Sequence, residues 1–262
     1  MESIRTAIVI PLYRNELTGD ENKSIERCYS LWSSKYDIYF VKPVTVTLSK
    51  ILEQFPNVRT VSFDPSFFKG KRGYNKLMLS PLFYEKFLDY TYIFIYQADG
   101  YAFRDELHQW CEKGYDYIGS PWIPREINSR WWYGIYRYAR GYYYRFKSHP
   151  DRSIQYYQVG NGGVSLRKTT IFYKVAREDR EKIVSFIKRL GSSSMFNEDV
   201  YWSFEAKTAT GNRLSKPGYK EALEFGFDMN PDVSYRLNGN RLPFCCHGFS
   251  HRRHRKFWQK FI

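Results

Sequence analysis

The stretch IFIYQADGYAF, residues 93–103, decides the fold expected for this sequence. It begins as a run of β-branched and aromatic residues, which is typical of a parallel strand buried on both faces. The run ends on Asp99, and Gly100 follows at once. Because an ionised carboxylate is costly to bury without a partner or a cation, we expect Asp99 either to cap a turn or to hold a ligand at the end of the strand.

Similar apolar runs alternate with amphipathic segments along the first half of the chain. The pattern predicts strands at 6–12, 37–41, 58–63 and 115–118, and helices at 24–34, 46–55, 73–88 and 105–113. Strands that alternate with helices favour an α/β sheet with parallel strands. Ligands of such sheets gather at the carboxyl ends of the strands, which is where Asp99 is expected.

The second half of the chain is richer in glycine, aromatic and basic residues. A turn in QVGNGGVSLRK leads into a predicted strand, residues 168–190 predict one charged amphipathic helix or two, and NEDVYWSFEA begins another, with Asn197 as a plausible cap. Residues 125–157 form a basic, aromatic insert, and the chain ends in the basic stretch HRRHRKFWQK. The insert suits a packed helix, a lid over an acceptor, or contact with anionic lipids.

Composition limits the partners and the location of the protein. The net charge of +14 over 262 residues favours anionic partners, namely nucleic acid, phosphate-bearing substrates or an anionic membrane surface. The four cysteines lack zinc-site spacing, which favours free thiols in a reducing compartment. No segment approaches the ~20 apolar residues that span a bilayer. We therefore expect a cytoplasmic protein, either free or peripheral at the inner face of the membrane.

Four other features suit either a structural or a functional role. The adjacent carboxylates Glu198 and Asp199 suit the start of a helix or a general base. The glycines of GNGG (160–163) suit a tight turn or a backbone that approaches a ligand closely. Trp122 suits the core or the stacking of a sugar ring. His247 suits the core or a divalent-metal site.

Five elements in this order resemble a known family: YQADG, YDYIGSPW, VGNGGVSLR, NEDV and PFCCHGF. From AIVIPLYR to PFCCHGF, the chain resembles the bacterial glycosyltransferase-like family DUF5672, which is similar to nucleotide-sugar-dependent glycosyltransferases of the GT-A fold. The resemblance implies a GT-A-like (Rossmann-like) mixed α/β sheet with helices on both faces, in a single domain. About 1–118 would form the nucleotide-sugar-binding half, and about 119–262 the acceptor and catalytic half.

The resemblance also implies a divalent-cation site, for Mn²⁺ or Mg²⁺, on the diphosphate of the donor. The D-x-D element of GT-A enzymes reads Gln97-Ala98-Asp99 here, so an amide replaces the first carboxylate. Asp99 would be the remaining acidic ligand, and His247 matches the late histidine that completes such sites. The replacement puts the affinity for the metal, and the need for it, in question.

Roles for the other residues follow from the same resemblance. NED matches the x-E-D element of inverting members, so Asp199 is expected as the general base and Glu198 as the residue that orients the acceptor. Donor contacts are expected from Pro11, Tyr13, Arg14, Arg72, Tyr74, Asn75, Gln97 and Asp99. Acceptor or sugar contacts are expected from Trp122, Asn161, Gly162, Gly163 and Arg167. Arg72 and Arg167 are further expected to form charge-assisted bonds to phosphate.

These expectations describe a glycosyltransferase of the hexosyltransferase type. It would move a sugar from a nucleotide-sugar donor, UDP-linked by default, to a saccharide or lipid-linked acceptor, with inversion at the anomeric carbon. Two alternatives stay open: a non-catalytic sugar-binding module of the same fold, and a basic nucleic-acid-binding protein. No nucleic-acid-binding motif is recognisable, so no specific nucleic-acid partner is expected.

Overall fold

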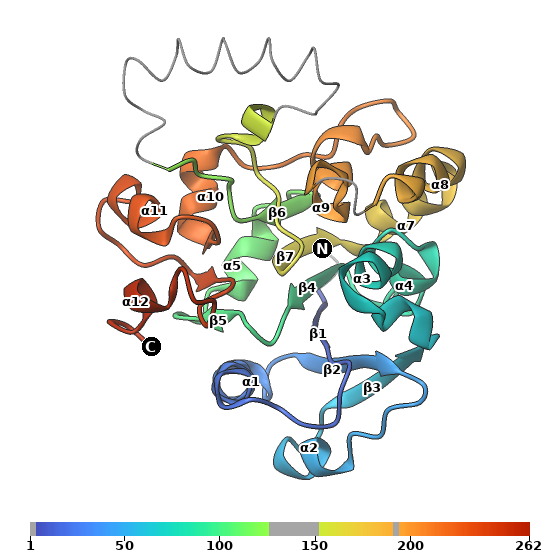
Figure 1. Cartoon of the computed structure of the whole chain (residues 1–262). Helices are drawn as coiled ribbons and strands as arrows, with labels where there is room; N and C mark the ends of the chain where they lie inside the picture. Colours follow the sequence, from blue (N-terminus) through green and yellow to red (C-terminus); the bar gives the residue numbers. More distant parts are fainter. Residues whose placement is uncertain (1–3, 126–151, 191–193) are drawn as a thin grey trace.

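The protein is built around a mixed six-stranded β-sheet. A computed structural model describes residues 4–125, 152–190 and 194–262 (Figure 1). The strands are β1 (Thr6–Pro11), β2 (Asp37–Pro43), β3 (Arg59–Phe63), β4 (Tyr92–Tyr96), β6 (Tyr117–Gly119) and β7 (Val164–Lys168). Their order in the sheet is β3-β2-β1-β4-β7-β6.

Strand β7 runs against its two neighbours, whereas β1, β2, β3 and β4 are parallel. The strands expected in the first half of the chain therefore point the same way, β7 is reversed between β4 and β6, and the mixed sheet implied by the family resemblance is confirmed. The direction of β7 follows from the position of the glycine turn that precedes it. Gly163 O accepts a hydrogen bond of 2.8 Å from Gln97 N–H, so the start of β7 lies beside the end of β4.

A second sheet has three very short strands in the order β5-β9-β8. They are β5 (Tyr101–Ala102), β9 (Cys245–Cys246) and β8 (Gly226–Phe227). β8 and β9 are parallel, and β5 is antiparallel to β9. The residues that directly follow β8 and β9, and those that precede β5, therefore share one end of this small sheet.

Helices pack on both faces of the large sheet, as expected. One face is covered by α1 (Gly19–Trp32), α2 (Ser49–Gln54), α5 (Leu107–Glu112) and α10 (Tyr219–Phe225). There the Trp32 ring meets Phe94 of β4 edge to face, with centroids 5.7 Å apart. Helix α1 begins before the expected residue 24, because Thr18 and Glu21 form a capping box that fixes its start.

The other face is covered by α3 (Gly70–Met78), α4 (Pro81–Glu85), α7 (Thr169–Glu178) and α8 (Arg180–Lys188). The single helix expected at 73–88 is wrong, because the chain breaks at Ser80. Pro81 has no N–H to continue the helix, and the Ser80 hydroxyl accepts from Leu82 N–H to cap α4. The expected alternative of two helices within 168–190 is confirmed by α7 and α8.

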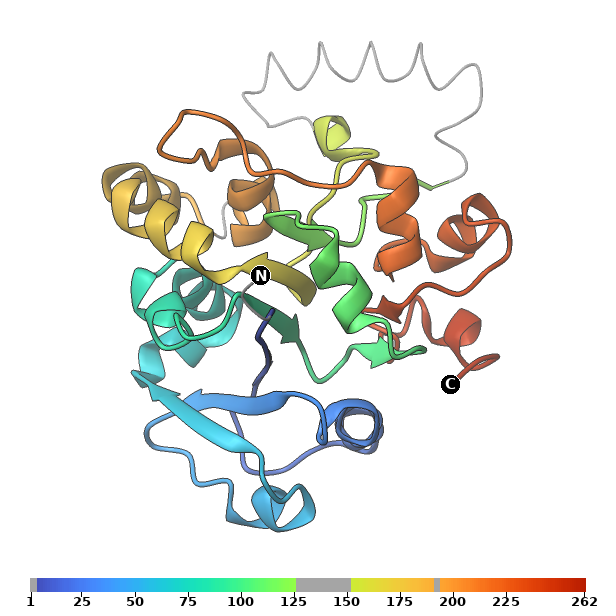
Figure 2. The same ribbon diagram turned by 180° about the vertical axis from the view of Figure 1, so that it is seen from behind.

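The remaining helices are short. Asn197 precedes α9 (Glu198–Val200) with an extended backbone but no side-chain cap bond, and a π-helical turn, Tyr201–Glu205, continues α9. Helices α11 (Pro231–Leu237) and α12 (Arg255–Trp258) share a third apolar cluster with β8. Figure 1 and Figure 2 place them on the opposite side of the molecule from α7 and α8.

Two expectations fall outside what the structure tests. Most of the insert expected at 125–157, including the stretch 130–147, lies outside the described residues, so its three uses stay predictions. The division into halves at about residue 118 also stays a prediction, although β7 of the second half completes the sheet of the first. Among residues 4–125, 152–190 and 194–262, no helix is long and apolar enough to cross a membrane.

Candidate active site

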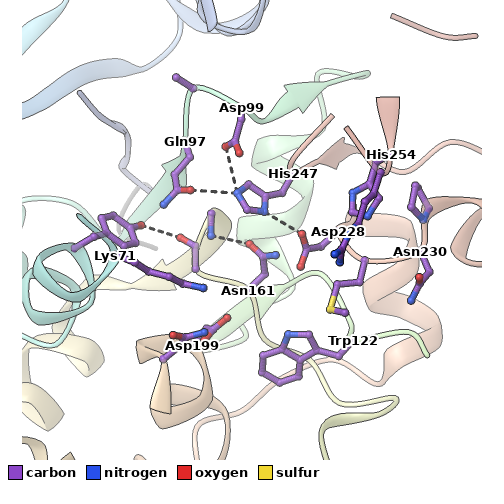
Figure 3. A pocket seen from close by; sticks show the side chains of 18 of the residues that line it. Lys71, Gln97, Asp99, Trp122, Asn161, Asp199, Asp228, Asn230, His247 and His254 are labelled. Carbon is purple, nitrogen blue, oxygen red and sulfur yellow. Dashed lines mark hydrogen bonds and ion pairs between the residues drawn. The ribbon is translucent and has the colours of Figure 1, made fainter. Parts of the chain in front are cut away.

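An open cleft of about 2110 Å³ lies at the edge of the large sheet where β1 and β4 end (Figure 3). Fourteen of the sixteen residues expected at the site line it: Pro11, Tyr13, Arg14, Tyr74, Asn75, Gln97, Asp99, Trp122, Asn161, Gly162, Gly163, Glu198, Asp199 and His247. Arg72 and Arg167 do not line the cleft. Residues from segments far apart in the chain, which the motifs predict at one site, therefore line one cleft.

Strand direction explains why these segments meet. Pro11 ends β1, and Gln97 directly follows β4. Because β7 is reversed, the turn at its start, 160–163, lies at the same edge. Strand β6 is also antiparallel to β7, so it points the same way as β4 and delivers Trp122 to this edge. A single reversed strand thus brings three motifs together.

His247 is contacted at both ring nitrogens (Figure 3). Its Nε2 lies 3.2 Å from Asp99 Oδ1 and 3.1 Å from Gln97 Oε1, and its Nδ1 lies 3.0 Å from Asp228 Oδ1. The small sheet creates this cluster. His247 directly follows β9, Asp228 directly follows the parallel strand β8, and Asp99 shortly precedes β5.

The two carboxylates favour the charged form of His247. Burial alone would lower the pKa of His247, but the charge of Asp99 and the hydrogen bond to Asp228 raise it well above its ordinary value. Burial alone would likewise raise the pKa of Asp99, but the charge of His247 lowers it. Asp99 and Asp228, which lie on either side of the imidazole, thus favour its protonation.

Asp99, His247 and Gln97 fit a divalent cation. They offer a carboxylate oxygen, an imidazole nitrogen and an amide oxygen, a set that suits Mn²⁺. His247 Nε2 lies 3.2 Å and 3.1 Å from the two oxygens, and neighbouring ligands of an octahedral ion bound at about 2.1 Å are about 3 Å apart. No three His, Cys, Asp or Glu side chains of the described residues converge as a metal site, so a cation at His247 would need the Gln97 amide as its third donor.

Asp199 lies across the cleft from the His247 cluster, between Lys71 and Trp122 in Figure 3. Its side chain is half-buried. Burial first, and the nearby carboxylate of Glu198 second, raise the pKa of Asp199 to about 7. A carboxylate with this pKa is suited to accept a proton at neutral pH.

Glu198 and Arg167 form a buried ion pair beside Asp199. Arg167 Nη2 lies 3.0 Å from Glu198 Oε1, and the two side chains are 0% and 2% exposed. Arg167 also donates to the hydroxyls of Tyr84 and Ser165. The expected contact between Arg167 and a phosphate is therefore not possible in this structure, where the guanidinium instead ties β7 to α9.

The other expected arginine also lies away from the site. Arg72 is exposed on α3 and does not line the cleft. Its neighbours do: Tyr74 donates its hydroxyl to Gly162 O (2.9 Å), and Asn75 Oδ1 accepts from Glu198 N–H (2.5 Å). Tyr74 and Asn75 thus tie α3 to the glycine turn and to the start of α9.

The glycines of GNGG make room for protein side chains. A Cβ atom on Gly163 would lie 2.1 Å from His247 Nε2, and one on Gly162 would lie 2.2 Å from Glu198 Oε1. The side chain of Asn161 holds this turn, because its Oδ1 accepts hydrogen bonds from the N–H groups of Gly163 and Val164. The sequence suggested that these glycines leave room for a ligand. In the structure, the room left by Gly163 and Gly162 is occupied by His247 and Glu198.

Trp122 has little ring surface left for a sugar. It stacks on Phe204, with centroids 6.1 Å apart and planes at 10°, and is 7% exposed. A Cβ atom on Gly160 would lie 2.3 Å from its ring, so Gly160 packs directly against it. Trp122 therefore shapes the wall of the cleft more than it offers a stacking face.

Several residues that line the cleft were not identified from the sequence. Asp228 follows a two-residue strand, which is too short to show a periodic pattern. Lys71 lines the cleft, whereas its neighbour Arg72, which the motif predicts there, does not. The basic end of the chain, whose pattern indicated membrane or nucleic-acid contact, contributes Arg253, Lys256 and Lys260. That charge pattern is the feature that could have identified them.

The fold is similar to that of solved glycosyltransferases. The galactosyltransferase LgtC, solved with donor and acceptor sugar analogs, is 13% identical, with 92% of this chain and 86% of LgtC covered and a TM-score of 0.54. GlyE of Streptococcus pneumoniae TIGR4 is 9% identical, with 98% and 60% covered and a TM-score of 0.54. The mannosyltransferase Ktr4p of S. cerevisiae, solved with GDP, is 8% identical, with 84% and 68% covered and a TM-score of 0.50. At these identities the likeness shows the fold alone, and it confirms the expected GT-A fold.

Sequence comparison places the chain in a family. No curated protein matches the sequence. The family described as "Protein of unknown function (DUF5672)" matches residues 57–247, which is more than half of the chain. This range contains four of the five quoted motifs and the first residues of PFCCHGF up to His247. The expected resemblance is confirmed, and the chain belongs to the DUF5672 family.

Proposed function

We propose that this chain is a nucleotide-sugar-dependent glycosyltransferase. The observation that carries the proposal is the convergence of Asp99, His247 and Asp199 on one cleft. Ligand pockets commonly have volumes of about 300–1,000 Å³, so a cleft of about 2110 Å³ has room for a donor and an acceptor together. The fold supports the proposal, since LgtC, which shares it, was solved with donor and acceptor sugar analogs.

The donor nucleotide is proposed to lie over the end of β1. Tyr13 lines the cleft there with 58% of its surface exposed, and its ring is available to stack on a base. Arg14 lies beside it, bound to Glu21 at 2.5 Å. Pro11 forms the floor at the end of the strand. Uridine is taken as the default base from the wider fold.

The donor diphosphate is proposed to lie between the His247 cluster and the basic end of the chain. Asp99, His247 and Gln97 would hold Mn²⁺ or Mg²⁺, which when bound neutralises charge that develops on the leaving diphosphate. Arg253, Lys256 and Lys260 line the same cleft and would donate charge-assisted hydrogen bonds to phosphate oxygens. They replace Arg72 and Arg167 in this role.

Asp199 is proposed as the general base for the acceptor hydroxyl. It lies across the cleft from the His247 cluster, so it would remove the proton on the face opposite the departing diphosphate. Attack from that face inverts the anomeric carbon. Glu198, held by Arg167, would act through Asp199 by helping to raise its pKa.

The acceptor is proposed to be a saccharide, free or lipid-linked. The exposed basic side chains at the end of the chain would suit a lipid-linked acceptor at an anionic membrane surface. The cytoplasmic location, and the peripheral contact with the membrane, stay predictions.

The test measures, by NMR, how fast the wild type and Asp199→Asn consume nucleotide sugars in the presence of Mn²⁺. We expect the wild type to consume a nucleotide sugar and the variant to be about 10²–10⁴-fold slower, which is the usual contribution of a general base. Asp89→Asn, an exposed carboxylate outside the cleft, is the matched control and keeps full activity. Equal turnover by Asp199→Asn and the wild type would reject Asp199 as the base.

The same experiment separates the alternatives. A wild type that binds nucleotide sugars tightly but never turns them over is a sugar-binding module of the same fold. Steeply salt-dependent binding to arbitrary DNA, without nucleotide-sugar binding, is the behaviour of a nucleic-acid-binding protein. Retention of configuration in the NMR spectrum of the product would reject the inverting mechanism while keeping the transferase.

A further inference from the structure

The site lacks one acidic ligand of the D-x-D element but has an additional carboxylate behind the histidine. Gln97 is neutral, so among the described residues Asp99 is the acidic side chain that contacts His247 Nε2. On the far side of the imidazole, Asp228 Oδ1 lies 3.0 Å from Nδ1. Asp228 is 20% exposed, and nothing in the sequence motifs points to it.

The small sheet fixes Asp228 in this position. Phe227 and Cys246 are opposite each other in the parallel strands β8 and β9, so the residues that follow them, Asp228 and His247, are held side by side. His247 N–H also donates to Phe227 O at 2.9 Å. The contact between the carboxylate and the imidazole is therefore built into the backbone pairing.

We propose that Asp228 is a positioning residue that orients His247 for a divalent cation and supplies, from behind the imidazole, the negative charge that Gln97 does not provide. The proposal rests on the cation site of the proposed function. A carboxylate that accepts Nδ1–H fixes the tautomer in which Nε2 carries the free lone pair, and it makes the imidazole a more basic ligand.

Two observations favour positioning over direct ligation by Asp228. Its carboxylate contacts Nδ1, whereas Asp99 and Gln97 contact Nε2. In the part of the chain that the structure describes, Asp99, His247 and Asp228 do not form a three-residue metal site.

The first test is direct titration of the full-length chain with Mn²⁺ alone, following free Mn²⁺ by electron paramagnetic resonance. Asp228→Asn keeps the shape and an acceptor oxygen but removes the charge. We expect Mn²⁺ to bind this variant about 10–100-fold more weakly than the wild type, as is usual for partners of metal-bound histidines. The readout does not depend on transferase activity.

The matched control is Asp232→Asn on α11, which removes the same charge four positions further along the chain. Asp232 is 59% exposed and lies 3.8 Å from Arg236. Its loss is expected to leave the affinity for Mn²⁺ unchanged. Equal weakening by Asp228→Asn and Asp232→Asn would overturn the proposal, because the effect would then come from net charge alone.

The second test restores the acidic ligand with Gln97→Asp, alone and combined with Asp228→Asn. We expect Gln97→Asp to bind Mn²⁺ more tightly, and Asp228→Asn to weaken binding less in that background than in the wild type. Equal effects of Asp228→Asn in both backgrounds would overturn the compensation. Gln97→Asp alone tests the premise without Asp228→Asn, because Mn²⁺ binding no tighter than in the wild type would show that the site does not lack negative charge and would overturn the proposal.

The outcomes separate this proposal from the proposed function. A wild-type chain that binds no Mn²⁺ overturns the role of Asp228, while turnover of a nucleotide sugar by the same chain would leave the transferase standing. Binding of Mn²⁺ that depends on Asp228, without any turnover, would instead support the role of Asp228 and count against the transferase.

Discussion

If Asp199 is the general base, its ionisation should set the pH dependence of the transfer reaction. Burial and the charge of Glu198 raise its pKa to about 7, and a base works only in its ionised form. We therefore predict that kcat/KM rises with pH through about 7 and levels off above it. Initial rates between pH 5.5 and 8.5 at saturating Mn²⁺ measure this. A profile that falls as the pH rises through 7 would contradict the assignment.

Gly163 is the residue that leaves space for His247. A Cβ atom there would lie 2.1 Å from His247 Nε2, which is too close for any side chain. We predict that Gly163→Ala displaces the imidazole and weakens Mn²⁺ binding at least 10-fold, measured by titration. Gly19→Ala, where nothing lies within 4 Å of the new atom, is the control and should bind Mn²⁺ normally. Normal binding by Gly163→Ala would show that His247 is not a ligand.

At the scale of residues, short motifs predicted which side chains lie together but not which are buried. QAD, NED and the late histidine predicted that Asp99, Asp199 and His247 converge, and all three line one cleft. Arg167 looked like a ligand for phosphate, yet it is fully buried against Glu198. Whether a charged side chain faces solvent or a buried partner depends on contacts between distant segments, which no local pattern contains.

At the scale of elements, the buried pair of Arg167 on β7 and Glu198 on α9 lies next to Asp199, the proposed base. Removal of one partner of a buried ion pair leaves an uncompensated charge, which costs about 3–5 kcal/mol. We predict a loss of this size in the free energy of unfolding for Arg167→Met, measured by urea denaturation. Arg72→Met, on an exposed position, should change it by less than about 0.5 kcal/mol.

The double variant Arg167→Met/Glu198→Gln checks the cause of that loss. With the carboxylate neutralised, the double variant should be more stable than Arg167→Met alone, because no unpaired charge stays buried. A double variant that is less stable than Arg167→Met would mean that packing, rather than charge, explains the effect.

Element types were predictable where periodicity is strong, and element directions were not. The apolar run before Gln97 identified β4 correctly, because a strand buried on both faces has few other interpretations. The reversal of β7 left no trace in its own sequence, since hydrophobic alternation is the same in either direction. The strands β5, β8 and β9 have two residues each, which is too short for a periodic pattern, so the small sheet that builds the His247 cluster could not be predicted from the sequence.

At the scale of the whole molecule, the fold concentrates chemistry at one edge. The reversed β7 brings its glycine turn to the edge where β1 and β4 end, and the small sheet adds Asp228 and His247. Residues within 253–260 form another wall of the cleft. There Arg255 of α12 forms an ion pair of 3.0 Å with Asp20 of α1. The net charge of +14 is thus partly explained, since basic side chains from this end line the cleft.

The central claim is that this cleft binds a nucleotide sugar through a cation held by Asp99 and His247. A thermal-shift screen of nucleotide sugars with and without Mn²⁺, on the wild type and on Asp99→Ala, tests it most directly. A ligand at 100 times its Kd stabilises the native state by about 2.7 kcal/mol, which for a chain of this size raises the Tm by about 5–10 °C. We predict such a rise for the wild type with one nucleotide sugar and Mn²⁺, and its loss in Asp99→Ala. No rise with any nucleotide sugar, with or without Mn²⁺, would contradict the account.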